Sequence, residues 1–179
     1  SFGAIDVTKS NTIIANSLSK NLGMSGWRLG YVITNEQLTD QILKVNQHLI
    51  TCPASILAYY VARHFDDISR TTAPQIRRLA EKREVVASYM DEIGLSYFPG
   101  TSTFYFLVSI EESRLASDEF STLLLSKSKV SVVPGSGYGR SCDHFIRISI
   151  GTESMERTCR GLDLVKQLIQ ATASQPALV

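Results

Sequence analysis

Cysteine and histidine are scarce in this sequence of 179 residues. The three cysteines, Cys52, Cys142 and Cys159, are widely spaced and form no CxxC motif. An odd number of separated cysteines fits neither a disulfide framework nor a zinc site. The three histidines are scattered too, so we expect no metal centre. This cysteine usage is typical of a reducing compartment, and we expect a cytoplasmic protein.

The net charge is also small, and long apolar runs are missing. The 18 lysines and arginines nearly balance the 17 aspartates and glutamates, and no segment gathers the basic residues. A nucleic-acid partner would require a basic stripe, so we expect none. No apolar run approaches the roughly 20 residues of a membrane helix, and no signal peptide is evident. We therefore expect no membrane partner either.

The first ninety residues combine two short strands with helices. Short β-branched apolar runs predict strands over 11–18 and 27–34. Apolar residues at helical spacing predict a helix over 36–50, and Thr34 with Gln37 resembles a capping box before it.

Two more helices follow in the pattern. Pro53 suits the first turn of one helix, and Pro74 suits the start of another. The second has an apolar face that includes Arg83, and Gly94 is its expected C-cap.

From about residue 94 the chain alternates strands and helices. The predicted elements are a strand over 102–110, a helix from Ser117 to about Ser126, strands over 129–135 and 144–151, and a last helix that begins at Thr152 or Ser154. This order predicts an α/β layer in which helices cover one face of a small sheet. The first strand pair would instead be the end of another sheet.

Lys20 is the first candidate for chemistry. It follows a predicted buried strand, within a turn rich in serine, asparagine and glycine. A lysine amine can form a Schiff base with a carbonyl compound when it is held and partly desolvated. The alternative is a solvated turn lysine without a chemical role.

Arg28, Ser17 and Ser19 surround Lys20 in the sequence. A guanidinium fork and hydroxyl groups suit a phosphate, and a lysine suits a carbonyl. This combination fits pyridoxal 5′-phosphate (PLP). A structural salt bridge is the alternative role for Arg28.

Arg147 is the third candidate. It alternates with isoleucines in the predicted strand 144–151. An arginine in the middle of a strand needs an anionic partner to offset its desolvation. That partner is either a substrate carboxylate, bound by the guanidinium fork, or an internal Asp or Glu.

These motifs together resemble a known family. The stretch SLSKNLGMSGWRLGY closely resembles the lysine signature of the class I/II aminotransferases, which are fold-type I PLP-dependent enzymes. Farther on, FPGTSTFYFLV, VSVVPGSGYG and FIRISIG are similar to later motifs of this family, with Tyr138 where a phenylalanine is usual. The resemblance covers nearly the whole chain.

The resemblance implies a role for each candidate. Lys20 would be the catalytic residue and would bind PLP covalently. Ser17, Ser19 and Arg28 would hold the cofactor, with Ser19 the weaker candidate. Arg147 would bind the substrate carboxylate, and no metal is implied. The substrates would be an L-amino acid and a 2-oxo acid, and the full-length parent enzyme would be a homodimer.

The resemblance also implies an incomplete fold. In this family the residues that bind the pyridine ring precede the lysine, and only nineteen residues precede Lys20 here. We therefore expect a C-terminal portion of the fold, inactive as a transaminase by itself. Its parts would be the end of the large PLP-binding domain (1–34), connecting helices (35–93), a small C-terminal α/β domain (94–172) and a tail (173–179).

Two alternatives stay open at this point. A PLP-dependent lyase or cyclase-type enzyme of the same fold would use the same lysine and arginine. A non-catalytic α/β module could also retain the family signature.

Overall fold

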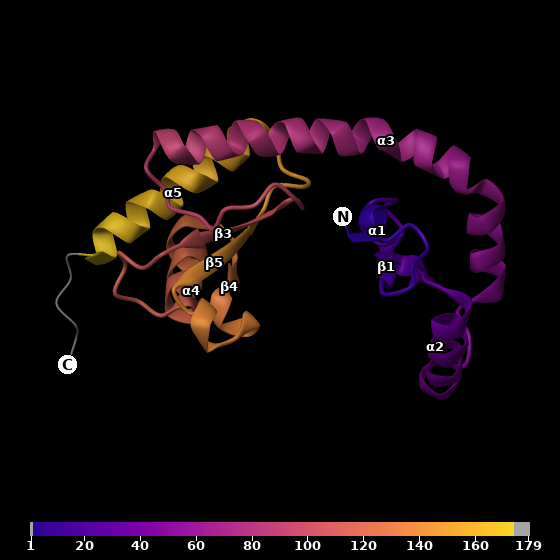
Figure 1. Ribbon diagram of the computed structural model, residues 1–179. Helices are drawn as coiled ribbons and strands as arrows, with labels where there is room; N and C mark the ends of the chain where they lie inside the picture. Colours follow the sequence, from indigo (N-terminus) through magenta and orange to yellow (C-terminus); the bar gives the residue numbers. More distant parts are fainter. Residues whose placement is uncertain (1, 174–179) are drawn as a thin grey trace. The chain divides into compact units, whose positions relative to one another are not determined.

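The computed structural model describes residues 2–173. The chain forms two compact units, Ser1–Arg77 and Arg78–Val179, and a long helix runs through the boundary (Figure 1). Each unit has its own apolar core, so the two are described separately.

The first unit is built on an antiparallel strand pair. After a short helix α1 (Phe2–Ile5), strand β1 (Ile14–Ser17) pairs with β2 (Gly30–Ile33), and a 3-10 helix η1 (Ser25–Trp27) lies between them. Both predicted strands are confirmed, although each is shorter than its apolar run. The apolar pattern gave no indication of α1.

Helix α2 (Glu36–Leu49) confirms the predicted helix to within one residue. The capping box at Thr34 is wrong, because Asn35 is the N-cap and its side chain accepts a hydrogen bond from Leu38 N at 2.9 Å. The Thr34 hydroxyl instead donates to Thr12 O at 3.1 Å, which ties the start of α2 to the segment before β1.

Helix α3 (Ser55–Glu92) is one helix where two were predicted. Its irregular residue is His64 (φ −116°, ψ 17°), whereas Pro74 lies inside the helix. A proline there removes the hydrogen bond to the carbonyl four residues earlier. That residue, Arg70, is exposed, so water can hydrate its carbonyl and the helix continues. The predicted C-cap is confirmed, because Gly94 has φ +67° and Leu95 N donates to Met90 O at 2.8 Å.

The second unit contains a three-stranded antiparallel sheet in the order β3-β5-β4. Its strands are β3 (Tyr105–Ser109), β4 (Val133–Pro134) and β5 (Phe145–Ser149). In the register, Arg147 lies between Leu107 on one side and Val133 on the other. Strands β3 and β5 confirm their predictions, but the strand predicted over 129–135 is reduced to two residues. Its other residues leave the sheet, and Val130 and Val132 pack against the core instead.

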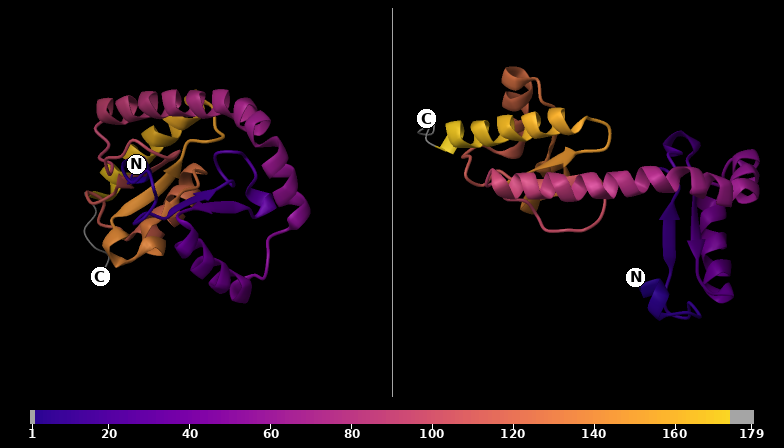
Figure 2. Two further views of the ribbon diagram at one scale, coloured as in Figure 1. Left: turned by 45° about the vertical axis from the view of Figure 1, so that its right-hand side comes forward. Right: turned by 90° about the horizontal axis from the view of Figure 1, so that it is seen from above.

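Helices cover the sheet face opposite Arg147. They are the second half of α3, α4 (Ser117–Ser128) and α5 (Met155–Ala173). All three contribute side chains to a core with Phe106, Val108 and Ile146 of the strands. The second half of α3 runs next to α5 (Figure 2), where Tyr89 donates to Asp163 Oδ1 at 2.7 Å. The predicted α/β layer is confirmed.

The ends of these helices refine the predicted caps. Helix α4 begins at Ser117 as predicted; its N-cap is Ala116, and Ser117 N and Oγ both donate to Asp143 Oδ1. Ser154, and not Thr152, caps α5, because its hydroxyl accepts from Arg157 N at 3.2 Å. Two 3-10 turns, η2 (Gly135–Tyr138) and η3 (Arg140–Cys142), connect β4 to β5. Most of the expected tail, residues 174–179, lies outside the described residues.

The division at residues 34, 93 and 172 stays a prediction about domains. Within residues 2–173, none of the helices is both long enough and apolar enough to cross a bilayer.

Candidate active site

The loop between β1 and β2 carries Ser19, Lys20 and Arg28, and Ser17 ends β1 just before it. Leu18 N donates to Leu29 O at 3.1 Å, which closes the loop at its base. Three buried leucines of the loop pack with Val61 of α3 in the core of the first unit; they are Leu18, Leu22 and Leu29. The packing of these apolar side chains thus fixes the loop against the core, and its polar side chains remain accessible to solvent.

Lys20 is an exposed side chain on a fixed backbone. Its carbonyl accepts a hydrogen bond from Gly23 N at 3.3 Å, in a turn that Gly23 completes with φ +67°. Its amine has no hydrogen-bond or ion-pair partner among residues 2–173. An amine that no internal carboxylate holds is available to a ligand.

Arg28 occupies an unusual backbone conformation. It is left-handed (φ 54°, ψ 44°) at the end of η1, and its Nη1 donates to Ser25 O at 2.8 Å. No carboxylate in the described part of the chain pairs with it, so the alternative of a structural salt bridge is not what these residues form. The exposed guanidinium keeps further donors that can reach an anion.

Ser17 and Ser19 lie next to each other. Ser19 N donates to Ser17 Oγ at 3.2 Å, and Ser17 pairs with Gly30 across the two strands. A Cβ on Gly30 would lie 2.7 Å from Asn16 O, so this close approach of the strands requires glycine. The glycine of the WRLGY stretch therefore serves packing and not chemistry. The hairpin brings four of the five predicted site residues to one end of one strand pair.

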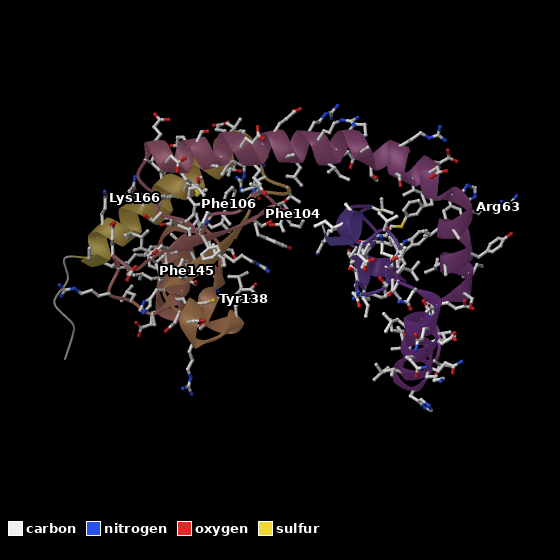
Figure 3. All side chains as sticks on the ribbon, viewed as in Figure 1. Arg63, Phe104, Phe106, Tyr138, Phe145 and Lys166 are labelled. Carbon is white, nitrogen blue, oxygen red and sulfur yellow. The ribbon has the colours of Figure 1, made fainter. Side chains whose placement is uncertain are left out.

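Arg147, the fifth predicted residue, lies in the second unit on the uncovered face of the sheet. It lines a groove of about 420 Å³ together with Arg83, Phe98, Tyr105 and Tyr138. Tyr138 extends from η2 (Figure 3). The groove is apolar apart from its arginines, hydroxyl groups and backbone, so it suits an anion attached to an organic group.

The guanidinium of Arg147 has aromatic neighbours in place of a carboxylate. Its Cζ lies 4.3 Å from the ring centroid of Tyr105 and 5.4 Å from that of Tyr138. No Asp or Glu among residues 2–173 pairs with it, so the internal partner considered as an alternative is not found there. Within residues 2–173 its Nε is buried and has no hydrogen-bond partner. A buried donor without a protein partner is available to an external acceptor.

Arg83 is a residue of this groove that sequence reasoning did not assign a role. It is only 8% exposed, and its guanidinium donates to the carbonyls of Gly100, Thr103 and Tyr105 at 2.8, 3.3 and 2.7 Å. Burial lowers the pKa of this guanidinium from its ordinary value. The signal was available: an arginine lies within the otherwise apolar face predicted for this helix.

No metal site accompanies these residues. The described residues contain no group of three or more His, Cys, Asp or Glu side chains that could hold a metal ion.

Comparison with known proteins identifies the family. Residues 4–162 match aminotransferase class I and II. The chain is 30% identical to an aspartate aminotransferase of Pyrococcus abyssi and 30% identical to an aromatic-amino-acid aminotransferase of Thermococcus litoralis, each over 95% of this chain and 44% of the relative. The chain therefore spans less than half the length of these curated relatives.

A solved structure agrees with the sequence relatives. The aromatic aminotransferase of Pyrococcus horikoshii has a TM-score of 0.79 and 26% identity, over 96% of this chain and 46% of that one. This likeness spans both units of an α/β structure that corresponds to part of the fold-type I fold. The chain belongs to the class I and II aminotransferase family.

Proposed function

We propose that the whole protein containing this chain is a PLP-dependent aminotransferase that transfers an amino group between an L-amino acid and a 2-oxo acid. The observation that carries the proposal is the unpartnered amine of Lys20, on a fixed loop of a chain that matches this family over residues 4–162. The relatives are named for different substrates, so the proposal specifies no particular amino acid.

The residues of the β1–β2 loop fit PLP. The donor set combines an amine for the aldehyde with hydroxyl and guanidinium donors for the phosphate, and these are the exposed side chains of Lys20, Ser17 and Arg28. Ser19 is half-buried and is the weaker candidate. When bound, PLP supplies an electron sink for the electrons of a broken bond at the substrate Cα.

The chain's own residues orient the reactants and move a proton. Lys20 Nζ would take the proton from the substrate Cα, because a neutral amine is a base. Arg147 would donate two parallel hydrogen bonds to the substrate carboxylate, which orients the bonds at Cα. Its unpartnered Nε and the absence of a paired carboxylate within residues 2–173 support this assignment.

Reductive trapping tests the role of Lys20. PLP is added to the longest natural form of the protein that contains these residues, borohydride fixes the adduct, and mass spectrometry locates it. We expect the label on Lys20, its loss in Lys20→Ala and its retention in Lys44→Ala, which removes an exposed lysine of α2. The label on another lysine would refute the assignment.

Turnover of the same proteins tests the reaction. With an amino acid donor and 2-oxoglutarate, an aminotransferase forms glutamate, whereas a lyase releases ammonia without needing the 2-oxo acid. We expect Lys20→Ala to lower kcat/KM at least about 1,000-fold, because general acid–base catalysis alone contributes about 100- to 10,000-fold. Ammonia release without glutamate would favour the lyase, and no turnover by any form would favour the non-catalytic module.

We also propose that the whole protein is a cytoplasmic homodimer. Exposed apolar side chains on the first unit support an association surface, among them Leu49, Ile56 and Tyr59. Sedimentation equilibrium of the longest natural form tests the dimer, and a concentration-independent monomer would refute it.

A further inference from the structure

Among the described residues, the neighbours of the Arg147 guanidinium are two aromatic rings and no carboxylate. The Tyr105 ring lies 4.3 Å from its Cζ and the Tyr138 ring 5.4 Å, both within the range of cation–π attraction. A carboxylate neighbour would use the same N–H donors that a substrate carboxylate needs. A ring face attracts the cation and leaves those donors free, so it can orient the guanidinium without competing with a ligand.

Tyr105 reaches this position through the register of the sheet. Tyr105 pairs with Ser149 and Leu107 pairs with Arg147, so Tyr105 and Arg147 are diagonal neighbours on the same face. The backbone just before Tyr105 is strained, because Thr103 is a β-branched residue with φ 68°. The Thr103 hydroxyl accepts from Tyr105 N at 3.2 Å and helps to hold the turn.

Arg83, a residue of α3, donates hydrogen bonds to the backbone of this strained turn. Its guanidinium donates to three carbonyls of residues 100–105, the shortest contact being 2.7 Å from Nη1 to Tyr105 O. Its Cζ also lies 3.9 Å from the ring centroid of Phe106. Arg83 makes these contacts through two nitrogens of a planar fork, Nη1 and Nη2, whereas a lysine offers a single ammonium nitrogen and cannot occupy both positions.

We propose that Tyr105 and Arg83 are positioning residues for Arg147: Arg83 fixes the backbone of 100–105, and this backbone places the Tyr105 ring against the Arg147 guanidinium. The role in substrate binding rests on the proposed function, in which Arg147 binds the carboxylate. The positioning of the Arg147 guanidinium by Tyr105 and Arg83 does not depend on the proposed function.

The experiment observes Arg147 directly. The full chain is labelled with ¹⁵N-arginine, and the Nε–H resonance of Arg147 is assigned by its loss in Arg147→Lys. Its chemical shift and hydrogen exchange are compared in wild type, Tyr105→Phe, Tyr105→Leu and Arg83→Lys. Phe98→Leu is the matched control, because Phe98 lines the same groove but is largely exposed and makes no ring contact with Arg147. Binding of 2-oxoglutarate is measured on each variant by ligand-observed NMR.

The proposal predicts a distinct pattern. Tyr105→Phe and Phe98→Leu keep the Arg147 resonance of wild type. Tyr105→Leu moves the resonance toward that of a free arginine, speeds its exchange and weakens 2-oxoglutarate about five- to tenfold, because one ring contact is worth about a factor of this size. Arg83→Lys moves the same resonance although Arg83 does not contact Arg147.

Other outcomes overturn particular parts. An unchanged Arg147 resonance in Tyr105→Leu refutes the role of Tyr105. An Arg83→Lys protein that is folded by circular dichroism and has a wild-type Arg147 resonance refutes the role of Arg83. If Arg83→Lys does not fold, Thr103→Val addresses the same turn. Valine cannot accept the hydrogen bond from Tyr105 N, so the Arg147 resonance should move, and an unchanged resonance in a folded Thr103→Val refutes the pathway through 100–105. Equal binding of 2-oxoglutarate by Arg147→Lys refutes the proposed role of Arg147 in carboxylate binding and leaves the geometric result intact.

Discussion

The two units differ in how much apolar surface they bury. In the first unit, within the described residues, the buried cluster has four members, and helix α2 contributes none. Among the described residues of the second unit the cluster has fourteen members, eleven of which come from three helices and two strands. Since apolar burial is the main favourable term in folding, the second unit should be the more stable of the two.

The same contrast applies to their surfaces. The first unit exposes most of its large apolar residues, including Val32 and Ile33 of β2 and Val45 and Leu49 of α2. The predicted apolar spacing of α2 is therefore present, but Val45 and Leu49 are 60% and 75% exposed. These exposed apolar side chains belong to the unit that carries Lys20, and they are the ones on which the proposed association surface rests.

The difference in burial between the two units also applies to the two side chains to which we assign chemistry. Lys20, which we propose to react with the cofactor, lies on the unit with the smaller buried cluster, whereas Arg147, which we propose to bind the carboxylate, lies on a strand of the unit with the larger one. An arginine that must keep a fixed orientation benefits from a rigid sheet behind it. The contrast can be tested by changing the packing in each unit in turn.

The largest effect is expected from Phe120→Ala in α4. Phe120 is fully buried at the centre of the larger cluster, and such a truncation costs about 3–5 kcal/mol of unfolding free energy through lost burial and the cavity left behind. Urea denaturation followed by far-UV circular dichroism measures the change.

The matched control is Leu125→Ala on the same helix. Its side chain is 50% exposed, so its loss should change the unfolding free energy by about 0.5 kcal/mol or less. Equal effects of the two variants would contradict the buried core described for the second unit.

Much of this architecture could be predicted from periodicity. Alternation in β3 and β5 identified which residues face the core, and helical spacing identified α2 and α5 with boundaries close to those observed. These patterns are local and record which face is buried. The candidate residues Lys20 and Arg147 were found by the chemistry of their side chains and by resemblance.

Other features depend on contacts distant in sequence. The shortness of β4 follows from Val130 and Val132 turning into the core, which no local pattern indicates. The continuity of α3 through Pro74 was not indicated by the sequence, and Arg70, four residues earlier, is exposed. The role of Arg83 could not be assigned, because the carbonyls it binds are about twenty residues away.

An intermediate effect is expected from Gly30→Ala in β2. The added Cβ would lie 2.7 Å from Asn16 O, so the two strands must separate, at a cost of about 1–3 kcal/mol. Trp27 is the one tryptophan of the sequence and packs against the core of the first unit, so its fluorescence in urea reports this unit.

Gly26→Ala is the control for this variant. A Cβ at Gly26 meets no atom within 4 Å, and its φ is not positive, so we expect little change in the Trp27 transition. A loss of stability in Gly26→Ala equal to that in Gly30→Ala would show that the loop, and not the approach of the strands, limits this unit.

The smallest effect on stability is expected at low pH, where one aspartate carboxylate in each unit loses its charge. In the first unit, Asn11 N donates to Asp6 Oδ2 at 2.8 Å, and this bond is the main cause that lowers the pKa of Asp6 to about 2. In the second unit, the Ser117 hydroxyl lowers the pKa of Asp143 in the same direction. Because each pKa is lower in the folded state, each ionised carboxylate stabilises the folded state above about pH 4, the ordinary value for aspartate. That stabilisation is lost as the pH falls through the folded-state pKa.

The variants Asp6→Asn and Asp143→Asn should therefore act on different units, which Trp27 fluorescence and circular dichroism together can distinguish. At neutral pH, Asp6→Asn should lower the urea midpoint of Trp27 fluorescence slightly, and the difference from wild type should shrink as the pH falls from about 4 toward about 2, where the wild-type carboxylate also loses its charge. Asp143→Asn should show the same convergence in the circular dichroism transition and leave the Trp27 midpoint unchanged. A constant difference across this pH range would mean that the asparagine acts through packing and not through the charge. A shift of the Trp27 midpoint by Asp143→Asn would mean that the two cores unfold as one, since a carboxylate bound only within the second unit can otherwise affect only that unit.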